Sequence, residues 1–291
     1  MLRVAYLGPA GTHSEEALRA SAAEPVRAEP RTTVYETVMA VQQGEVDRAV
    51  VPLENSIEGG VAATLDALAG EADGVRIAAE VVHPIHHLLL ARKGTRLEQI
   101  ERLLSHPQAT AQCARFLRER LPRAERVAVS STAEAVRCVS EGPGAWGAVG
   151  SRIAAELYGC EVLAERIEDH PDNLTRFVWL ARAGDAAAAG TGPRKTSIVF
   201  WGFNDRSPGG LVSVLREISD RDINLTRIES RPRRAVLGRY MFFADLEGDA
   251  ADAAVAGALK ALSRRVDSLR VLGSYRSLGS PQRGLPAAGE R

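Results

Sequence analysis

The sequence has no excess of charge of either sign. Its 291 residues include 37 Lys and Arg and 37 Asp and Glu, so the formal net charge is zero. Binding to nucleic acid or to a membrane surface generally needs a basic excess or a basic stripe. The balance argues against both classes of partner, and any site for an anion must be built from local groups.

Cysteines and long apolar runs are also scarce. The three cysteines, Cys113, Cys138 and Cys160, are odd in number and lack a metal-binding spacing. They are typical of reduced thiols in a cytosolic protein. The N-terminus leads directly into a strand-like run at residues 2–7 without a signal-peptide pattern. Apolar runs stay below the roughly 20 residues that a membrane-spanning helix needs. We therefore expect a cytoplasmic protein.

Common cofactor and nucleophile motifs are missing. The glycines of residues 8–11 lack the third glycine of a dinucleotide fingerprint, and there is neither a phosphate loop nor a Gly-x-Ser-x-Gly elbow. On a helix, His83, His86 and His87 would share a face suited to a metal ion. Pro84 and the leucines that follow favour extended chain instead, in which residues 86 and 87 point in opposite directions. We predict no metal site and no cofactor.

What is present is a globular composition with alternating strand and helix patterns. Hydrophobic residues make up 45% and charged residues 25%, and the length suggests two or three compact units. Strands are expected at residues 4–7, 48–53, 77–82, 87–91, 127–129 and 147–150, helices at 14–23, 61–68, 109–120 and 133–140, and a short helix followed by a strand at 97–104. Such alternation predicts parallel sheets with helices on both faces.

The pattern suggests two α/β lobes followed by a smaller unit. The runs around residues 80–84 and 160–163 are expected to cross between the lobes. The predicted boundaries are a first lobe at about 1–79 and 162–181, a second lobe at about 80–161, a linker at 182–194, a second unit at 195–278 and a disordered tail at 279–291. In the second unit, strands and helices follow the order βαββαβ, which is the ferredoxin-like arrangement.

Three polar loops share one design, in which a strand ends in small and polar residues before a helix begins. They are residues 8–14, 52–60 and 105–109. Thr12 or Ser14 is expected to cap the first helix, Ser105 the third, and Pro107 suits a first helical turn. Free N–H groups at a helix N-terminus favour carboxylate or phosphate. Ordinary capping explains each loop singly, whereas three loops facing one cleft would form a site for an acidic metabolite.

A fourth segment, residues 172–177, brings charged and hydroxyl groups to the start of an apolar strand. It reads Asp172-Asn173-Leu174-Thr175-Arg176-Phe177. A hydroxyl and a guanidinium are thereby delivered at the mouth of a buried sheet, where a small anionic substrate would fit. The alternative is a turn that opens an ordinary strand.

These four segments resemble the motifs of prephenate dehydratase, in the family's order, across residues 1–181. The resemblance implies a two-lobed, type II periplasmic-binding-protein-like catalytic domain. Residues 195–278 resemble the ferredoxin-like ACT domain, an amino-acid-sensing module. Two positions depart from the family pattern, since His13 replaces a common Phe and Gly210 a usual Ala or Ser. A chorismate mutase or dehydrogenase segment is missing, so the chain looks like a stand-alone enzyme.

The resemblance also implies an activity and a set of site residues. The activity is the decarboxylative dehydration of prephenate to phenylpyruvate in L-phenylalanine biosynthesis, by a carbon–oxygen lyase. Thr175, Arg176 and Phe177 form the family's catalytic motif. We expect Thr175 to donate a hydrogen bond to the leaving oxygen, and Phe177 to pack under the site. Arg176 would pair with a substrate carboxylate or brace a loop carboxylate. Candidate substrate-binding residues are Thr12, Ser14, Asn55, Ser56, Ser105 and Gln108. The possible acids are Glu54 and His106, each of which could equally brace a helix end.

Regulation is implied by the second unit. The resemblance places L-phenylalanine at an interface between the ACT domains of two chains, in a homodimer or homotetramer. Candidate effector-binding residues are Pro208, Gly209, Gly210, Leu211, Asn224, Glu229, Ser230, Arg231 and Pro232. Alternatively, Gly209 and Gly210 only permit a tight turn before a helix. The rival functions are arogenate dehydratase, which acts on the transaminated analogue, and a non-catalytic, amino-acid-regulated ligand sensor.

Overall fold

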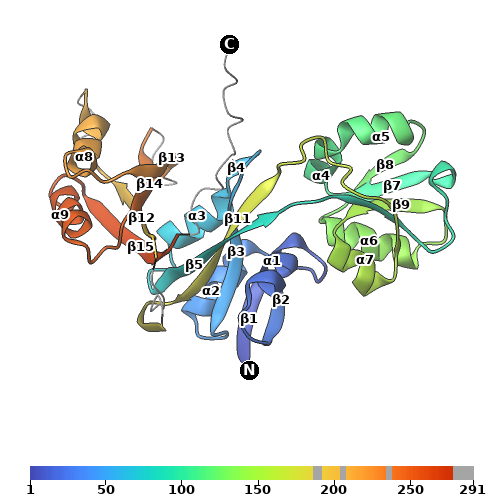
Figure 1. Ribbon diagram of the computed structural model, residues 1–291, viewed down its shortest axis with the longest axis horizontal. Coiled ribbons are helices and arrows are strands. Elements are labelled where there is room, and N and C mark those ends of the chain that lie inside the picture. Colours follow the sequence, from blue (N-terminus) through green and yellow to red (C-terminus); the bar gives the residue numbers. More distant parts are fainter. Residues whose placement is uncertain (186–191, 204–207, 234–237, 278–291) are drawn as a thin grey trace, which may run out of the picture. The chain divides into compact units, whose positions relative to one another are not determined.

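The chain folds into two compact units (Figure 1). The computed structural model describes residues 1–185, 192–203, 208–233 and 238–277. The first unit comprises residues 1–76 and 81–186, and the second comprises residues 77–80 and 187–291. Among the described residues, no helix is both long and apolar enough to cross a membrane.

The first lobe is a mixed sheet with the strand order β2-β1-β3-β11-β5, to which β4 adds beside β3. Its strands are β1 (Leu2–Leu7), β2 (Val26–Arg31), β3 (Arg48–Asn55), β4 (Gly59–Gly60), β5 (Val75–Pro84) and β11 (Leu174–Arg182). Strand β1 is parallel to β2 and β3, but β11 is antiparallel to β3. The prediction of a purely parallel sheet was therefore wrong, because β11 enters from the second lobe without a crossover helix.

The second lobe is also a mixed sheet, with the order β10-β6-β9-β7-β8. Its strands are β6 (Leu88–Ala91), β7 (Arg102–Ser105), β8 (Glu125–Ala128), β9 (Trp146–Gly150) and β10 (Glu161–Ala164). Strand β6 is antiparallel to both β9 and β10. The residues around 160–163, which were expected to lead back to the first lobe, thus include a strand of the second sheet, and the return follows Ala164.

Helices cover both sheets. In the first lobe they are α1 (His13–Ser21), α2 (Val34–Gln42) and α3 (Ala62–Ala69); in the second they are η1 (Leu97–Gln99), α4 (Pro107–Gln112), α5 (Ala114–Arg120), α6 (Thr132–Glu141) and α7 (Arg152–Tyr158). The single helix predicted at 109–120 was wrong, because the chain breaks at Cys113, where φ is −113° and ψ is 19°. The sequence prediction also missed β2, α2 and α7. For α2 the sequence did contain a signal, because Thr33 is followed three residues later by Glu36, the pattern of a helix N-terminus. In the structure, the Thr33 side chain accepts a hydrogen bond from the Glu36 N–H as an N-cap.

Each lobe has a buried apolar core, and the second lobe has one on either face of its sheet. Val4, Tyr6, Leu18, Val50 and Phe177 belong to the core of the first lobe. In the second lobe, the core under α4 and α5 is centred on Leu89, Leu103, Cys113, Leu117 and Val149. The core under α6 and α7 is centred on Leu90, Leu104, Val136, Ala148 and Ala154.

The second unit confirms the predicted βαββαβ order. Its elements are β12 (Arg194–Trp201), α8 (Gly210–Ser219), β13 (Leu225–Pro232), β14 (Tyr240–Glu247), α9 (Ala253–Leu262) and β15 (Ser268–Arg276). The antiparallel sheet has the order β13-β14-β12-β15, and both helices pack on it through residues such as Val214, Ile218, Ala258 and Leu262. The predicted linker at 182–194 begins with the end of β11 and η2 (Ala183–Asp185). The predicted tail at 279–291 lies outside the described residues.

Candidate functional site

The second and fourth sequence motifs lie on adjacent strands. Thr175 on β11 is the register partner of Asn55 on β3, and Arg176 is the partner of Glu54. The register shifts between Arg176 and Phe177. Irregularities of this kind re-aim side chains and are common beside functional sites. The antiparallel pairing therefore brings the two motifs together from positions about 120 residues apart in sequence.

The Asn55 amide determines the direction of the hydrogen bond at Thr175. Its Oδ1 accepts from the backbone N–H groups of Ile57 and Glu58, each at 3.0 Å. Its Nδ2 must then be the donor, and it lies 2.8 Å from Thr175 Oγ1 and 2.7 Å from Asn173 Oδ1. Thr175 is only 7% exposed. Because its oxygen accepts from Asn55, its own proton is left to donate elsewhere.

The hydrogen bonds continue from the first lobe into the second. Asn173 Nδ2 donates to Gln112 Oε1 at 3.2 Å, and the same oxygen lies 3.0 Å from His87 Nε2. Gln112 Nε2 lies 3.4 Å from a carboxylate oxygen of Glu58. We call Asn55, Asn173 and Gln112 the amide chain. Asn173, Gln112 and His87 had no predicted role in the site. For Gln112, the available signal was a polar residue beside the buried Cys113.

Ser56 holds the segment that leads to Thr175. Its N–H donates to the Leu174 carbonyl at 2.8 Å, and its hydroxyl accepts from the Leu174 N–H at 3.0 Å. The hydroxyl also lies 3.4 Å from the Asp172 carbonyl oxygen. These contacts brace the backbone of residues 172–174. A contact between Ser56 and the substrate stays a prediction.

Arg176 and Glu54 face one another. An Arg176 guanidinium nitrogen lies 3.6 Å from a Glu54 carboxylate oxygen, and the Arg176 side chain is 11% exposed. The structure thus contains the bracing contact that the sequence analysis left open for Arg176. Two roles stay predictions: that Arg176 pairs with a substrate carboxylate, and that Glu54 acts as an acid.

Phe177 belongs to the core of the first lobe. The residue is 2% exposed, packs with Val4, Tyr6 and Leu18, and meets the His83 ring edge-on with 6.4 Å between ring centroids. Packing is therefore the role that the structure supports for this member of the motif.

Replacing Phe177 with alanine should lower the free energy of unfolding by about 3–5 kcal/mol, since a buried aromatic ring is lost and a cavity is left. Urea denaturation of the purified protein measures this. Phe177→Leu fills much of the same volume and serves as the control, with a smaller loss. An alanine variant as stable as the wild type would contradict the assignment of Phe177 to the core.

The first loop does not cap its helix as predicted. Thr12 occupies the N-cap position of α1, but its side chain makes no capping bond, and the hydroxyl instead donates to the Leu7 carbonyl at 2.9 Å. Ser14 is buried within the first turn of the helix. The Gly11 N–H donates to the Glu15 carboxylate at 2.7 Å. The predicted cap was wrong because the carbonyl of Leu7 takes the Thr12 hydroxyl.

In the third loop the cap is His106 rather than Ser105. His106 Nδ1 accepts from the Gln108 N–H at 3.3 Å, and Pro107 stands in the first turn as predicted. Ser105 is the last residue of β7, and within the described part of the chain its buried hydroxyl has no hydrogen-bond partner. An unpaired buried polar group costs about 1–3 kcal/mol, so it calls for an explanation such as a ligand. Ser105 thus stays a candidate for substrate binding, although the predicted cap was wrong.

The predicted site residues therefore fall into two groups. Contacts join those of β3 and β11 to one another, namely Glu54, Asn55, Ser56, Thr175 and Arg176. The second group consists of Thr12, Ser14, Ser105, His106 and Gln108. Among the described residues, no hydrogen bond links this group to Thr175. The same part of the chain contains no cluster of three or more His, Cys, Asp or Glu that could hold a metal ion.

In the second unit, Gly209 has a backbone reason to be glycine. It precedes α8 with φ of +84°, and a Cβ placed there would meet no atom within 4 Å. Backbone conformation alone therefore accounts for this glycine, as the alternative interpretation of the loop supposed. The predicted effector residues of β13 lie on an edge strand, which pairs with β14.

Comparisons with known proteins cover both units. The family model for prephenate dehydratase matches residues 4–185, and that for the ACT domain matches residues 196–264. A prephenate dehydratase from Mycolicibacterium vanbaalenii is 40% identical over 286 residues, covering 94% of this chain and 90% of that protein.

Two solved structures share nearly the whole fold. A prephenate dehydratase from Arthrobacter aurescens in complex with L-Phe is 40% identical with a TM-score of 0.86, covering 95% of this chain and 90% of that one. GqqA, described as a novel type of quorum quenching acylase, is 31% identical with a TM-score of 0.84, covering 96% and 98%.

Proposed function

The chain belongs to the prephenate dehydratase family of carbon–oxygen lyases and carries a C-terminal ACT domain, and we propose that Thr175 donates a hydrogen bond to the ring hydroxyl that leaves prephenate. Enzymes of this family act in L-phenylalanine biosynthesis. One observation carries the role of Thr175. The Asn55 amide donates to Thr175 Oγ1 at 2.8 Å, which leaves the threonine proton free to point at a ligand.

The chemistry needs such a donor. Prephenate is a dianion that loses carbon dioxide and the ring hydroxyl together. The bond from the ring to its carboxylate breaks, its electron pair enters the ring, and the C–O bond opposite breaks. The oxygen leaves as water after it gains a proton. An oriented hydrogen-bond donor stabilises the charge that develops on this oxygen. A threonine hydroxyl is a poor acid, so we assign it to orientation, with the proton supplied by water or a neighbouring acid.

Groups from both lobes would hold the substrate. Ser105 ends a strand of the second lobe with a buried, unpaired hydroxyl, which supports a bond to a substrate oxygen. Arg176 would contribute positive charge near the first lobe's strands while it braces Glu54. Excluding water from the ring carboxylate favours decarboxylation, because charge leaves that group in the transition state.

Side-by-side kinetics test the choice of substrate. Arogenate carries an ammonium where prephenate has a keto group. We expect purified full-length protein to form phenylpyruvate from prephenate with a kcat/KM at least tenfold above that for arogenate, which corresponds to about 1.4 kcal/mol in the barrier. The reverse ratio would make the chain an arogenate dehydratase, and turnover of neither would support the ligand sensor. Because one structural relative is described as an acylase, an acyl amide is included, and its hydrolysis without phenylpyruvate formation would replace the assignment.

We further infer that L-phenylalanine regulates the enzyme by binding at the ACT domains of paired chains, in the cytoplasm. The complex of the Arthrobacter relative with L-Phe supports this effector. The proposed binding residues are the loop before α8, with Gly209, and the edge strand β13. An edge strand offers unpaired backbone groups to a second copy.

Substituting Gly209 with alanine should weaken inhibition by L-phenylalanine. The residue has φ of +84°, so a Cβ strains the loop by about 1–2 kcal/mol. We expect the half-inhibitory concentration to rise about tenfold, within the usual range of allosteric coupling, at unchanged kcat. Gly94 in the second lobe has φ of +82° and equally open surroundings, so Gly94→Ala is the matched control and should leave inhibition unchanged. Equal effects of the two substitutions would contradict the proposed effector loop.

Deletion of residues 194–291 is the coarser version of this test. An active enzyme that L-phenylalanine no longer inhibits is expected, and unchanged inhibition would refute the assignment. The deletion also removes Lys195, whose ammonium lies 3.1 Å from the carboxylate of Glu80, a side chain that is 3% exposed. Removing an ion-pair partner of a buried carboxylate destabilises a protein strongly. The point substitution is therefore the cleaner experiment.

A further inference from the structure

His87 stands at the end of the amide chain, in the strand-to-strand connection of the first unit. Its backbone is fixed on both sides, because its N–H donates to Glu168 Oε2 at 2.9 Å and its carbonyl accepts from the Ile167 N–H at 3.0 Å. Its ring is buried, with the residue 3% exposed, and its Nε2 lies 3.0 Å from Gln112 Oε1. The ring is thus held in place by the backbone and directed at one amide.

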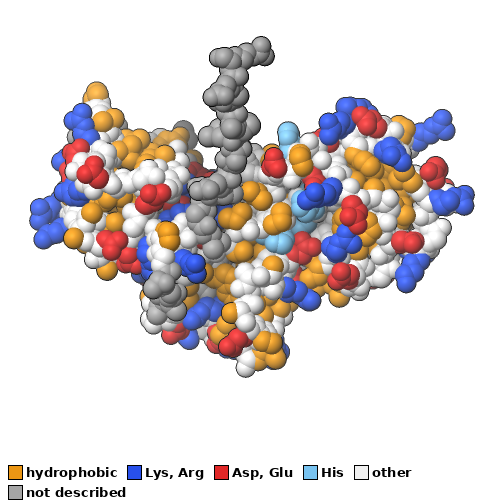
Figure 2. All heavy atoms as spheres, in the orientation of Figure 1, with side chains coloured by type: hydrophobic (Ala, Val, Ile, Leu, Met, Phe, Trp, Pro, Cys, Tyr) orange, Lys and Arg blue, Asp and Glu red, His pale blue; other side chains and the backbone are white. Residues whose placement is uncertain are grey.

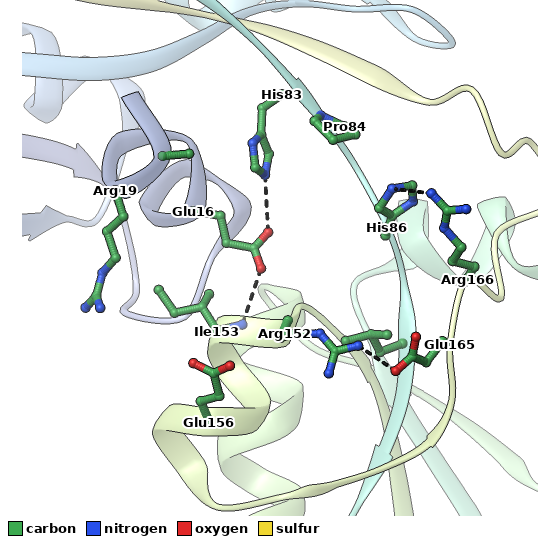
Figure 3. A pocket seen from close by; sticks show the side chains of 12 residues that line it. Glu16, Arg19, His83, Pro84, His86, Arg152, Ile153, Glu156, Glu165 and Arg166 are labelled. Carbon is green, nitrogen blue, oxygen red and sulfur yellow. Dashed lines mark hydrogen bonds and ion pairs between the residues drawn. The ribbon is translucent and has the colours of Figure 1, made fainter. Parts of the chain in front are cut away.

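His83, His86 and His87 lie close together in the sequence but have different surroundings. Histidine side chains gather on one face of the first unit, among acidic and basic groups (Figure 2). His86 lines a cavity of about 580 Å³, where its Nε2 lies 3.1 Å from Arg166 (Figure 3). Its Nδ1 bonds Glu168. His83 faces the same cavity and lies 3.5 Å from Glu16. His87 is absent from the lining of that cavity and contacts Gln112 instead. The opposite directions of residues 86 and 87 agree with the extended chain expected from the sequence.

The partners of Gln112 determine which ring nitrogen of His87 carries the proton. A carboxylate only accepts, so Gln112 Nε2 faces Glu58 and Gln112 Oε1 faces Asn173 and His87. His87 Nε2 must then be the N–H donor. Burial, together with the nearby His13 ring, lowers the pKa of His87 to about 4. At neutral pH the ring therefore holds a single proton, at Nε2, and the buried Nδ1 has no hydrogen-bond partner among the residues that the structure describes.

Resting on the proposed function, we propose that His87 is a positioning residue for the dehydration: it holds the Gln112 amide and, through Asn173, keeps the Asn55 donor in place at the Thr175 hydroxyl. Each step follows from the hydrogen bonds. His87 and Asn173 both donate to Gln112 Oε1. With its Nδ2 engaged there, Asn173 presents Oδ1 to Asn55.

Loss of the His87 donor would create a conflict in this chain. A Gln112 amide that flips would present an N–H to the N–H of Asn173, and Asn173 would flip in turn. Asn55 cannot follow, because two backbone N–H groups hold its oxygen. Two donors would then face one another in a part-buried site, which is costly. Their repulsion would push the Asn55 Nδ2 away from Thr175, and the hydroxyl would lose the hydrogen bond that sets its direction.

The substitutions His87→Gln and His87→Asn introduce the same amide group on side chains that differ in length by one methylene group. His87→Gln can place an amide N–H near the position of Nε2, whereas the amide of His87→Asn ends near Nδ1 and does not reach Gln112. In the full-length protein, we expect His87→Asn to lower kcat about tenfold with KM changed less than about threefold, a fraction of the loss of a direct donor. His87→Gln should retain kcat within about threefold of the wild type. His86→Asn keeps a donor for Glu168 and should leave kcat unchanged.

A double-mutant cycle separates positioning from general damage to the fold. If His87 acts by aiming Thr175, then His87→Asn should cost little further kcat in a Thr175→Ala protein. Equal losses in the Gln and Asn variants, a full additional tenfold loss in the Thr175→Ala protein, or wild-type kcat in His87→Asn would each overturn the proposal. Failure of the proposed function is distinguishable, because in that case the wild type itself forms no phenylpyruvate.

Discussion

Replacing Thr175 with alanine should lower kcat by about 10² or more, the loss expected for one oriented donor to a developing negative charge. KM should change little, because the hydroxyl stabilises the leaving oxygen mainly in the transition state. The side chain is buried against Asn55 and its proton is directed away from it. Initial rates of phenylpyruvate formation at saturating and limiting prephenate measure both constants.

Thr175→Ser is the matched control for this experiment. Serine keeps the oxygen that accepts from Asn55 and the proton that the account assigns to the substrate, and it loses only a methyl group. Its kcat should stay within about tenfold of the wild type, well above that of the alanine variant. Near-normal kcat in Thr175→Ala would remove the role assigned to this hydroxyl.

Converting Asn55 to aspartate should be at least as damaging, with kcat lowered by about 10²–10³. The substitution replaces the Nδ2 donor by an oxygen of nearly the same size. A carboxylate only accepts, so the Thr175 hydroxyl would turn its proton toward residue 55 and away from the substrate. The added negative charge would also repel a dianion, and KM should therefore rise as well.

Asn55→Ala separates these two effects. Alanine removes the donor without a competing acceptor, so the Thr175 proton stays available and the loss of kcat should be smaller than in Asn55→Asp. Steady-state kinetics of both variants, with thermal unfolding to check that each is folded, make the comparison. An aspartate variant that is more active than the alanine variant would contradict the assigned direction of the Asn55–Thr175 bond.

Local patterns in the sequence predicted most of the elements and the residues of the Thr175-Arg176-Phe177 motif, although they missed β2, α2 and α7. Apolar runs and turn residues predicted β3, β11 and the βαββαβ unit, because those signals are contained within short windows. Strand direction was not accessible in this way. Whether β11 runs parallel or antiparallel to β3 depends on how the chain returns from the second lobe, which alternation alone does not specify.

The amide chain was beyond local reasoning for a related reason. Its bonds join Asn55 to Asn173 and Asn173 to Gln112, which are 118 and 61 positions apart. The polar residue at 112 marks a candidate position, but the sequence around Gln112 and His87 does not identify their partners. The predicted caps at Thr12 and Ser105 were wrong because neither hydroxyl faces the helix N-terminus. The Thr12 hydroxyl donates to the Leu7 carbonyl, and the Ser105 hydroxyl is buried and unpaired among the described residues.

The single-turnover rate of phenylpyruvate formation by the Thr175→Val variant decides whether the Thr175 hydroxyl assists the leaving group. Valine reproduces the shape of threonine and lacks only the hydroxyl, so packing on β11 is kept and the donor is lost. We expect a rate about 10² or more below that of the wild type. A rate within about threefold of the wild type would contradict it, because the hydroxyl would then contribute nothing appreciable to the departure of the leaving oxygen.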